Sequence, residues 1–229
     1  MCLTLAKSIF LYTLWGMYLK PLVSVALLGF ATTAEARPVS YAGGWTLIEE
    51  TNRQTTTGLL HYSPDARYSL GARVDWDRKE DILFTGVQGT WLAKRWFGED
   101  YQANVYFWGA AGAAQGIDNN LGETRFGAQG GIIADWETRK LFVSYHASVR
   151  EFGELDATAA HAARLGFAPY EGDTGDLHTW FMVELDNRPD NAEPIGVTPL
   201  VRFFYGSALF EAGWSVTDDQ PLLNFQYRF

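Results

Sequence analysis

The end of the chain carries the pattern that most constrains its fold. Residues 222–229 read Leu-Leu-Asn-Phe-Gln-Tyr-Arg-Phe. Successive side chains of an extended strand point to opposite faces, so the apolar and polar residues of this segment separate onto two faces. The apolar face holds Leu223, Phe225, Tyr227 and Phe229, and the polar face holds Asn224, Gln226 and Arg228. The chain is therefore predicted to end in an amphipathic β-strand.

The same two-residue period continues through residues 37–229, broken at short intervals by Gly, Asn, Asp and Pro clusters. Such alternation predicts strands joined by turns. We expect twelve of them, at 40–49, 57–63, 67–76, 82–93, 102–113, 124–135, 140–150, 159–168, 176–186, 195–204, 207–216 and 222–229.

Three segments leave alternatives to this count. The strand at 57–63 is short, and the alanine-rich run 157–163 could form a helical turn. Pro199 falls inside the strand at 195–204, although a closed sheet has no free edge for a residue that lacks an N–H group. Pro199 would then mark a bulge, or the strand would begin after it. Ten strands are the first alternative and eight the second.

Residues 1–36 have the features of a secretory signal peptide. Lys20 precedes an apolar run at 22–31, and Ala34-Glu35-Ala36 forms a small-x-small cleavage site. This leader is long, and a true start at Met17 would leave a more compact one. The competing interpretation is a transmembrane helix, which would place Lys20 at a depth where charge is costly.

Composition restricts the part of the chain that follows the leader. The only cysteine, Cys2, lies in the leader, so disulfides and thiol chemistry are excluded from residues 37–229. The net charge of −9 disfavours nucleic-acid binding. No apolar run after Ala31 is long enough for a spanning helix, so any membrane crossing must use strands.

The polar faces carry single charges at strand centres. This is expected when one face of a closed sheet meets lipid and the other meets a polar lumen. Candidates for the lumen are Arg73, Asp75, Gln88, Arg125, His146, Arg150, Arg164, His178, Glu184, Arg202, Glu211 and Arg228. Acids and bases are mixed, which favours a network of paired charges over a substrate-selective lining and argues against strong selectivity for ions of one sign.

An apolar strand that ends in a C-terminal aromatic residue resembles the closing strand of bacterial outer-membrane β-barrels. The resemblance implies an all-β fold, a closed antiparallel transmembrane up-and-down barrel of twelve strands formed by residues 37–229 as one domain. It also implies export through the Sec pathway of a Gram-negative bacterium, and an outer-membrane location in contact with lipid and lipopolysaccharide. Phe225, Tyr227 and Phe229 would be the insertion signal that the barrel-assembly machinery recognises.

Strand parity predicts which connections face the periplasm. If the last strand runs toward the periplasm, the connections after the second, fourth, sixth, eighth and tenth strands lie there, and they are tight. The opposite set is longer and more acidic, as expected for outer loops. Acidic loops such as 77–81 and 218–219 offer oxygen ligands for divalent cations shared with lipopolysaccharide. We expect no protein-bound metal centre and no cofactor.

Two further features bear on function. The strands at 102–113 and 124–135 are rich in Gly and Ala, which would either make room for bulky neighbours or form a flat patch for a partner. The triplet His146-Ala147-Ser148 resembles the catalytic pair of outer-membrane phospholipases and lipid A deacylases, with His146 as base and Ser148 as nucleophile. Val149 replaces the Asn that follows the serine in those families, and the pair lies on the lumen face.

The sequence favours a structural barrel or a narrow channel for small polar solutes or ions, without enzymatic activity. A lipid-modifying hydrolase that uses His146 and Ser148 is one alternative. An envelope adaptor without transport is another. The solute, the gating and the oligomeric state do not follow from the sequence.

Overall fold

The computed structural model describes residues 38–117, 124–173, 175–189 and 193–229. They form twelve strands, which are β1 (Gly44–Thr51), β2 (Thr55–Asp65), β3 (Tyr68–Asp77), β4 (Ile82–Phe97), β5 (Gln102–Gly116), β6 (Thr124–Glu137), β7 (Leu141–Glu151), β8 (Ala157–Phe167), β9 (His178–Asn187), β10 (Ile195–Tyr205), β11 (Ala208–Trp214) and β12 (Pro221–Arg228). The predicted leader, including Met17 and the cleavage-site residues Ala34 and Ala36, lies outside the described residues.

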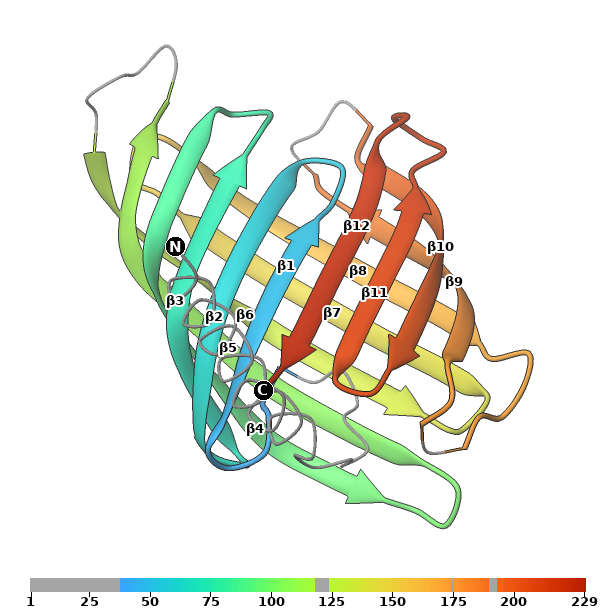
Figure 1. Cartoon of the computed structure of the whole chain (residues 1–229). Coiled ribbons are helices and arrows are strands. Elements are labelled where there is room, and N and C mark those ends of the chain that lie inside the picture. Colours follow the sequence, from blue (N-terminus) through green and yellow to red (C-terminus); the bar gives the residue numbers. More distant parts are fainter. Residues whose placement is uncertain (1–37, 118–123, 174, 190–192) are drawn as a thin grey trace, which may run out of the picture. The chain divides into compact units, whose positions relative to one another are not determined.

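The sheet closes on itself. Each strand pairs antiparallel with its sequence neighbours, and β1 pairs with β12 to complete the barrel (Figure 1). The closure extends to the last residue, because the Trp45 N–H donates to the Phe229 carbonyl at 2.9 Å. The prediction of a closed twelve-stranded antiparallel barrel is confirmed, and the alternatives of ten and eight strands are wrong. In the described ranges no helix is long and apolar enough to cross a membrane.

The barrel has two distinct ends. The connections after β2, β4, β6, β8 and β10 lie at one end together with the C-terminus, and we call it the turn end. The connections after the odd-numbered strands lie at the other, which we call the loop end (Figure 1). Four of the turn-end connections are short, whereas the one between β8 and β9 spans residues 168–177 and is longer than its sequence indicated.

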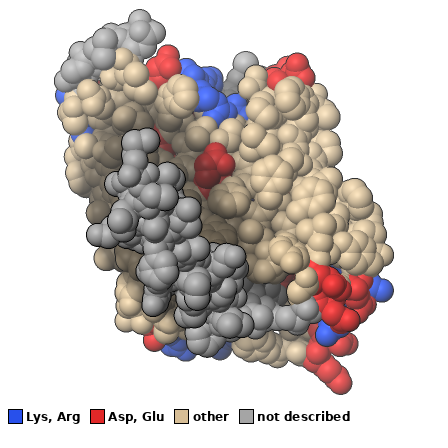
Figure 2. All heavy atoms as spheres, viewed as in Figure 1, with Lys and Arg blue, Asp and Glu red and all other residues tan. Residues whose placement is uncertain are grey.

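The pleat separates apolar from charged side chains. Large apolar residues cover the outer face, with Phe126 the most exposed at 74%. Figure 2 shows a broad band of uncharged surface with charged residues gathered toward the two ends. Aromatic side chains mark the turn end of this band, where the rings of Trp45 and Tyr62 lie 5.3 Å apart. An apolar exterior bounded by aromatic residues is the architecture of outer-membrane β-barrels.

Pro199 lies within β10 without a bulge, so the predicted bulge or later strand start is wrong. The β9–β10 register runs without a shift through the pair Pro199↔Val183. The neighbouring Val197 carbonyl accepts from the Val216 N–H on the β11 side, so Pro199 also directs its nitrogen toward β11. The β10–β11 ladder begins one residue later, at Leu200. The missing N–H therefore leaves the β9–β10 ladder intact and removes a hydrogen bond only on the β11 side.

The alanine-rich run at 157–163 also departs from one of the alternatives left open by the sequence. It begins β8 as a regular strand and pairs in register with β7. No helical turn forms there.

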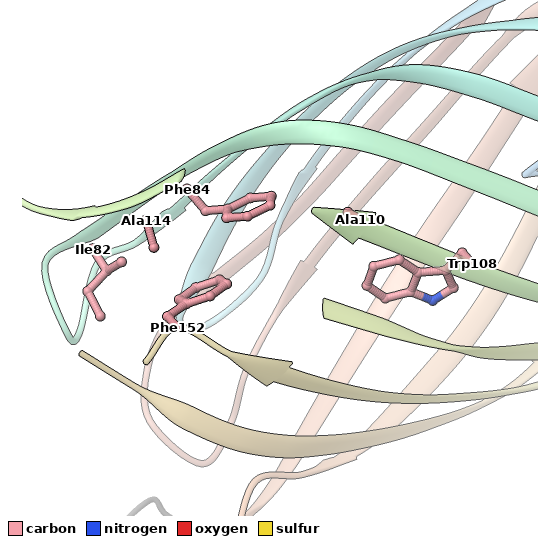
Figure 3. Close-up of a cluster of buried hydrophobic side chains, with 6 residues drawn as sticks. All are labelled: Ile82, Phe84, Trp108, Ala110, Ala114 and Phe152. Carbon is pink, nitrogen blue, oxygen red and sulfur yellow. The ribbon is translucent and has the colours of Figure 1, made fainter. Parts of the chain in front are cut away.

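The inward glycines of β5 and β6 make room for aromatic side chains. A Cβ atom on Gly127 would lie 2.8 Å from the Phe152 ring and 3.1 Å from Phe84, and one on Gly131 would lie 2.8 Å from Trp108. The rings of Phe84 and Phe152 stack with centroids 5.2 Å apart (Figure 3). The first explanation for the small residues, space for bulky neighbours, holds on the inner face.

Candidate functional site

The inner face of the barrel carries most of the charged side chains that lie within the strands. The register places all of the sequence-derived lumen candidates on this face, namely Arg73, Asp75, Gln88, Arg125, His146, Arg150, Arg164, His178, Glu184, Arg202, Glu211 and Arg228. Two of them lie at the ends. Arg125 pairs with the exposed Glu154 at the loop end, and His178 packs on Phe204 at the turn end.

At the loop end, ion pairs cross from one wall of the barrel to another. Arg150 of β7 lies 2.6 Å from Asp77 of β3, although these strands are not neighbours. Asp77 also accepts a hydrogen bond from Gln54 at 3.2 Å, and Gln54 in turn accepts one from Arg188 at 3.1 Å. Arg150 forms a second ion pair with Asp156.

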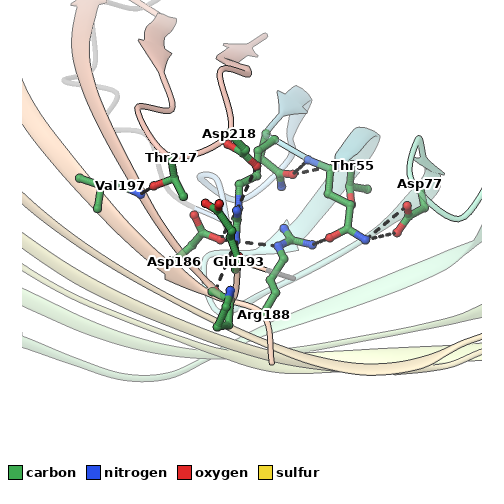
Figure 4. A network of polar contacts seen from close by, with 12 residues as sticks. Thr55, Asp77, Asp186, Arg188, Glu193, Val197, Thr217 and Asp218 are labelled. Carbon is green, nitrogen blue, oxygen red and sulfur yellow. Dashed lines mark hydrogen bonds and ion pairs between the residues drawn. The ribbon is translucent and has the colours of Figure 1, made fainter. Parts of the chain in front are cut away.

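A second bridge joins the β1–β2 loop to the opposite side. Arg53 pairs with Asp186 of β9 at 2.9 Å and with Asp218 of the β11–β12 loop at 3.0 Å (Figure 4). It also donates to the Glu193 carbonyl at 3.2 Å. We refer to Arg53, Gln54, Asp77, Arg150, Asp156, Asp186, Arg188 and Asp218 as the loop-end network. It spans the mouth of the lumen.

Burial shapes the protonation of the loop residues in this network. Burial lowers the pKa of the Arg188 guanidinium, and the nearby Asp186 carboxylate offsets this only in part. Burial likewise raises the pKa of the Asp156 carboxyl, which Arg150 opposes. The side chains of Arg53, Asp77 and Arg150 are only 4%, 2% and 12% exposed, so this part of the network is largely removed from bulk water.

At mid-depth, most ion pairs join residues of the same strand or of adjacent strands. Arg73 pairs with Asp75 of the same strand at 2.6 Å and donates to Gln88 of the adjacent β4 at 2.6 Å. Asp75 also accepts hydrogen bonds from Thr57 at 2.6 Å and from Gln129 at 2.5 Å. These contacts join β2, β3, β4 and β6.

The opposite wall is organised around Glu211. Its carboxylate pairs with Arg164 at 2.9 Å and with Arg202 at 2.6 Å, and it accepts a hydrogen bond from Asn224 at 2.5 Å. Arg164 has a second partner in Glu184, at 2.5 Å. Glu211 is 1% exposed, so its charge is balanced entirely by protein groups.

Aromatic rings hold two of these arginines against the wall. The Arg73 guanidinium lies 4.9 Å from the ring centroid of Trp108, and that of Arg202 lies 4.5 Å from the ring of Phe142. Cation–π contacts of this kind stabilise a guanidinium that is partly desolvated. They also keep these side chains out of the central space.

Two cavities occupy the lumen and meet at mid-depth. The cavity toward the loop end measures about 160 Å³ and the cavity toward the turn end about 250 Å³. Both are lined by the same nine residues where they meet, which we call the waist: Glu50, Thr57, Arg73, Trp108, His146, Ala162, Arg164, Glu184 and Asn224. Residues that line the two cavities are therefore found from the loop end to the turn end.

The cavity toward the turn end has a mixed lining. Ile48, Leu59 and Leu209 contribute apolar surface to it. Beside it, Val39 is buried inside the barrel against Leu92. The first described residues thus enter the lumen at this end and narrow it.

Glu50 was not among the sequence-derived candidates, although it lines both cavities. The first strand was predicted to end at residue 49, which assigned Glu50 to a loop. In the structure β1 continues to Thr51, and Glu50 points inward opposite Thr57 and Asn224. Extending the two-residue period from Thr46 by two further steps would have identified it.

The proposed catalytic pair lies on the inner face. Trp108 donates to the Nε2 atom of His146 at 3.3 Å. Within the described part of the chain, no hydrogen bond joins His146 to Ser148. The pair faces the lumen, whereas an acyl chain in the membrane would approach from the outer face.

Acidic residues of the loops named as cation ligands bind groups of their own chain. Asp77 pairs with Arg150, Asp218 pairs with Arg53, and Asp219 accepts a hydrogen bond from the Trp214 indole at 2.7 Å. Over the described ranges, no three His, Cys, Asp or Glu side chains come together in a way that would hold a metal ion.

Comparison with known proteins gives matches only among solved structures. No family model and no curated protein matches the chain. A solved KdgM porin is 13% identical, with a TM-score of 0.49, and the match covers 81% of this chain and 99% of that one. A KdgM porin in complex with disordered oligogalacturonate is 12% identical, with a TM-score of 0.48 and the same coverage. Similarity at this level carries no argument about function, and the architecture rests on the strand pairing described above.

Proposed function

We propose that residues 37–229 form an outer-membrane channel that passes small polar solutes or ions through a narrow lumen. The observation that carries the proposal is the pair of cavities, which share the waist and together have lining residues from the loop end to the turn end. A barrel with only a structural role would be expected to fill this space with side chains.

The exterior supports a membrane location. Apolar side chains cover the strands between the two ends, and aromatic residues lie at their margins. This surface would contact lipid and, in the outer leaflet, lipopolysaccharide. In this proposal the leader directs export through the Sec pathway, and the assembly machinery recognises Phe225, Tyr227 and Phe229. The turn end would face the periplasm and the loop end the exterior.

The lumen would be narrow for two structural reasons. The loop-end network spans one mouth, and residues 38–40 enter the other. The Arg73 and Arg202 guanidinium groups lie over aromatic rings, and the two cavities meet beside them at the waist. A solute would therefore pass close to charged walls, which favours small hydrated species over large uncharged ones.

Planar-bilayer recording tests the channel. Purified mature protein is expected to give small, uniform conductance steps when it inserts. Folding is checked in parallel by the shift in gel mobility between unboiled and boiled samples. A protein that shows this shift yet remains silent over repeated insertions would contradict the channel proposal.

Neither alternative function has an observation in its favour. A hydrolase requires His146 to activate Ser148, but the His146 ring accepts a hydrogen bond from Trp108 and both residues face away from the lipid. An adaptor requires a partner surface, and no feature of the described outer face identifies one. The Ser148→Ala variant is expected to leave channel conductance and lipid composition unchanged.

A further inference from the structure

Glu50 is a lumen carboxylate without an ion-pair partner of its own. It lines both cavities at the waist and is exposed to them. Among the described residues, no hydrogen bond or ion pair neutralises it. Because Glu50 is exposed to the cavities, its carboxylate is accessible to a solute that reaches the waist.

The other charges at mid-depth neutralise one another. Three arginines in this region are matched by three carboxylates, as Arg73 pairs with Asp75 and the Glu211 cluster joins Arg164, Arg202 and Glu184. Glu50 is the fourth carboxylate. Three positive and four negative groups leave one negative charge in excess. Arg73 and Arg164 line the same waist as Glu50, but each already has its own carboxylate.

A second oxygen lies beside Glu50. Asn224 is directly opposite it on β12, which places their Cβ atoms about 4.5–5.5 Å apart. The Asn224 amide nitrogen donates to Glu211. This fixes the orientation of the amide and leaves its carbonyl oxygen available, since no hydrogen bond from another described residue reaches that oxygen. A carboxylate and a carbonyl oxygen are thus adjacent on the wall of the waist.

The net charge of the loop-end network is also negative. The loop-end network contains three guanidinium groups, from Arg53, Arg150 and Arg188, and four carboxylates, from Asp77, Asp156, Asp186 and Asp218. The network itself carries one negative charge in excess. A cation that enters here meets an excess of negative charge before it reaches Glu50.

We propose that Glu50 and Asn224 form a cation-binding site at the waist, which makes the lumen favour cations over anions. The inference rests on the proposed channel function and deepens it. One carboxylate and one carbonyl suit a monovalent ion or a primary ammonium group, whereas Ca²⁺ binds six to eight oxygen ligands and Mg²⁺ prefers octahedral geometry. Because Glu50 is unpaired, removing its charge breaks no ion pair and leaves the fold intact.

Adjacent glutamates provide a matched pair of variants. Glu49 lies on the outer face of the same strand, and its carboxylate accepts a hydrogen bond from Thr51 at 2.7 Å. Figure 2 shows acidic surface over β1 within the uncharged band. Glu50→Gln and Glu49→Gln make the same chemical change one residue apart, the first toward the lumen and the second toward the lipid.

The test is the reversal potential of bilayer-inserted protein under a KCl gradient. The wild-type protein is expected to pass K⁺ in preference to Cl⁻. Glu50→Gln is expected to lower this permeability ratio by roughly fivefold, the effect of one unit charge about 4 Å away in water. Glu49→Gln is expected to retain the wild-type ratio. An unchanged ratio in Glu50→Gln, or an equal fall in both variants, would overturn the inference while the channel proposal stands.

A silent protein would contradict the channel proposal, and the site would then be tested by binding. The probe is Na⁺, followed by the ²³Na NMR line width in the presence of detergent-solubilised barrel. The wild type and Glu49→Gln are expected to broaden the line more than Glu50→Gln does. Equal broadening by all three would overturn the site.

Discussion

The loop end and the waist of this barrel use the same residue types in different geometries. At the loop end, Arg150 and Asp77 join strands β7 and β3, which lie on different parts of the wall. At the waist, Arg73 pairs with Asp75 on its own strand, and Arg202 pairs with Glu211 on the adjacent strand. One waist pair, Arg164 with Glu211, reaches from β8 to β11, but the other three stay on one strand or join adjacent strands, and a cavity remains beside them.

This difference separates two roles of charge in the lumen. The loop-end network links connections that would otherwise be held only by their own strands, and it occupies the mouth. The waist arginines pair mainly with carboxylates of their own or adjacent strands, and a cavity remains between them. The charged groups of the loop-end network therefore connect the loops at the mouth, whereas the charged groups of the waist line a cavity that a solute can enter.

The largest predicted effect concerns the waist. Glu211→Gln removes the only carboxylate that binds both Arg164 and Arg202. Loss of one partner from a buried ion pair typically costs about 3–5 kcal/mol of the free energy of unfolding. We expect a loss of this size, measured by urea unfolding in lipid vesicles. Glu184→Gln is the matched control and is expected to cost less, because Arg164 keeps Glu211. The reverse order would show that Glu211 does not organise this wall.

The second prediction concerns the loop end. Arg150→Met leaves Asp77 without its guanidinium, although Asp77 keeps hydrogen bonds from Gln54 and two backbone N–H groups. We expect a loss of about 3 kcal/mol, the lower end of the range for a buried pair. The same variant is expected to raise single-channel conductance because a contact across the lumen is lost.

Arg125→Met is the control for this change, since Arg125 faces the loop end but pairs with the exposed Glu154 at 3.7 Å. It is expected to change stability by less than about 1 kcal/mol. If Arg150→Met destabilised the barrel without changing conductance, the network would be a structural tie that does not restrict the mouth.

The smallest predicted effect comes from packing beside the loop-end network. Gly127→Ala would place a methyl group 2.8 Å from Phe152, which must move. Overpacking of this kind costs about 1–3 kcal/mol. Gly109→Ala, on the outer face and 3.9 Å from its nearest neighbour, is expected to be neutral. Thermal unfolding of the two variants, followed by gel mobility, distinguishes them. Similar melting of both would show that the Phe84–Phe152 stack does not limit this position.

Much of the architecture could be predicted from local pattern. The two-residue period identified the twelve strands and assigned residues such as Arg73 and Glu211 to the inner face. The two-residue period gave wrong results at the end of β1 and at Pro199. Glu50 was assigned to a loop because β1 was ended two residues early. Pro199 was predicted to disturb β10, but the neighbouring ladder begins only after it.

The candidate site could be predicted only in part. Arg53 and Arg188 belong to connections, where a charged residue is usually solvated, so nothing in the sequence indicated that they would span the mouth. The sequence did not indicate the partner of Arg150 either. Asp77 is far from Arg150 along the chain, and β3 is not a neighbour of β7.

The sequence by itself determined which side chains face inward and which face outward, because strand alternation is a local property of the extended backbone. Tertiary structure decided which inward charges meet. Closure and the relative register of the strands place Asp77 against Arg150 and leave Glu50 facing a cavity. These distances depend on the whole circumference of the barrel, and no short stretch of sequence contains them.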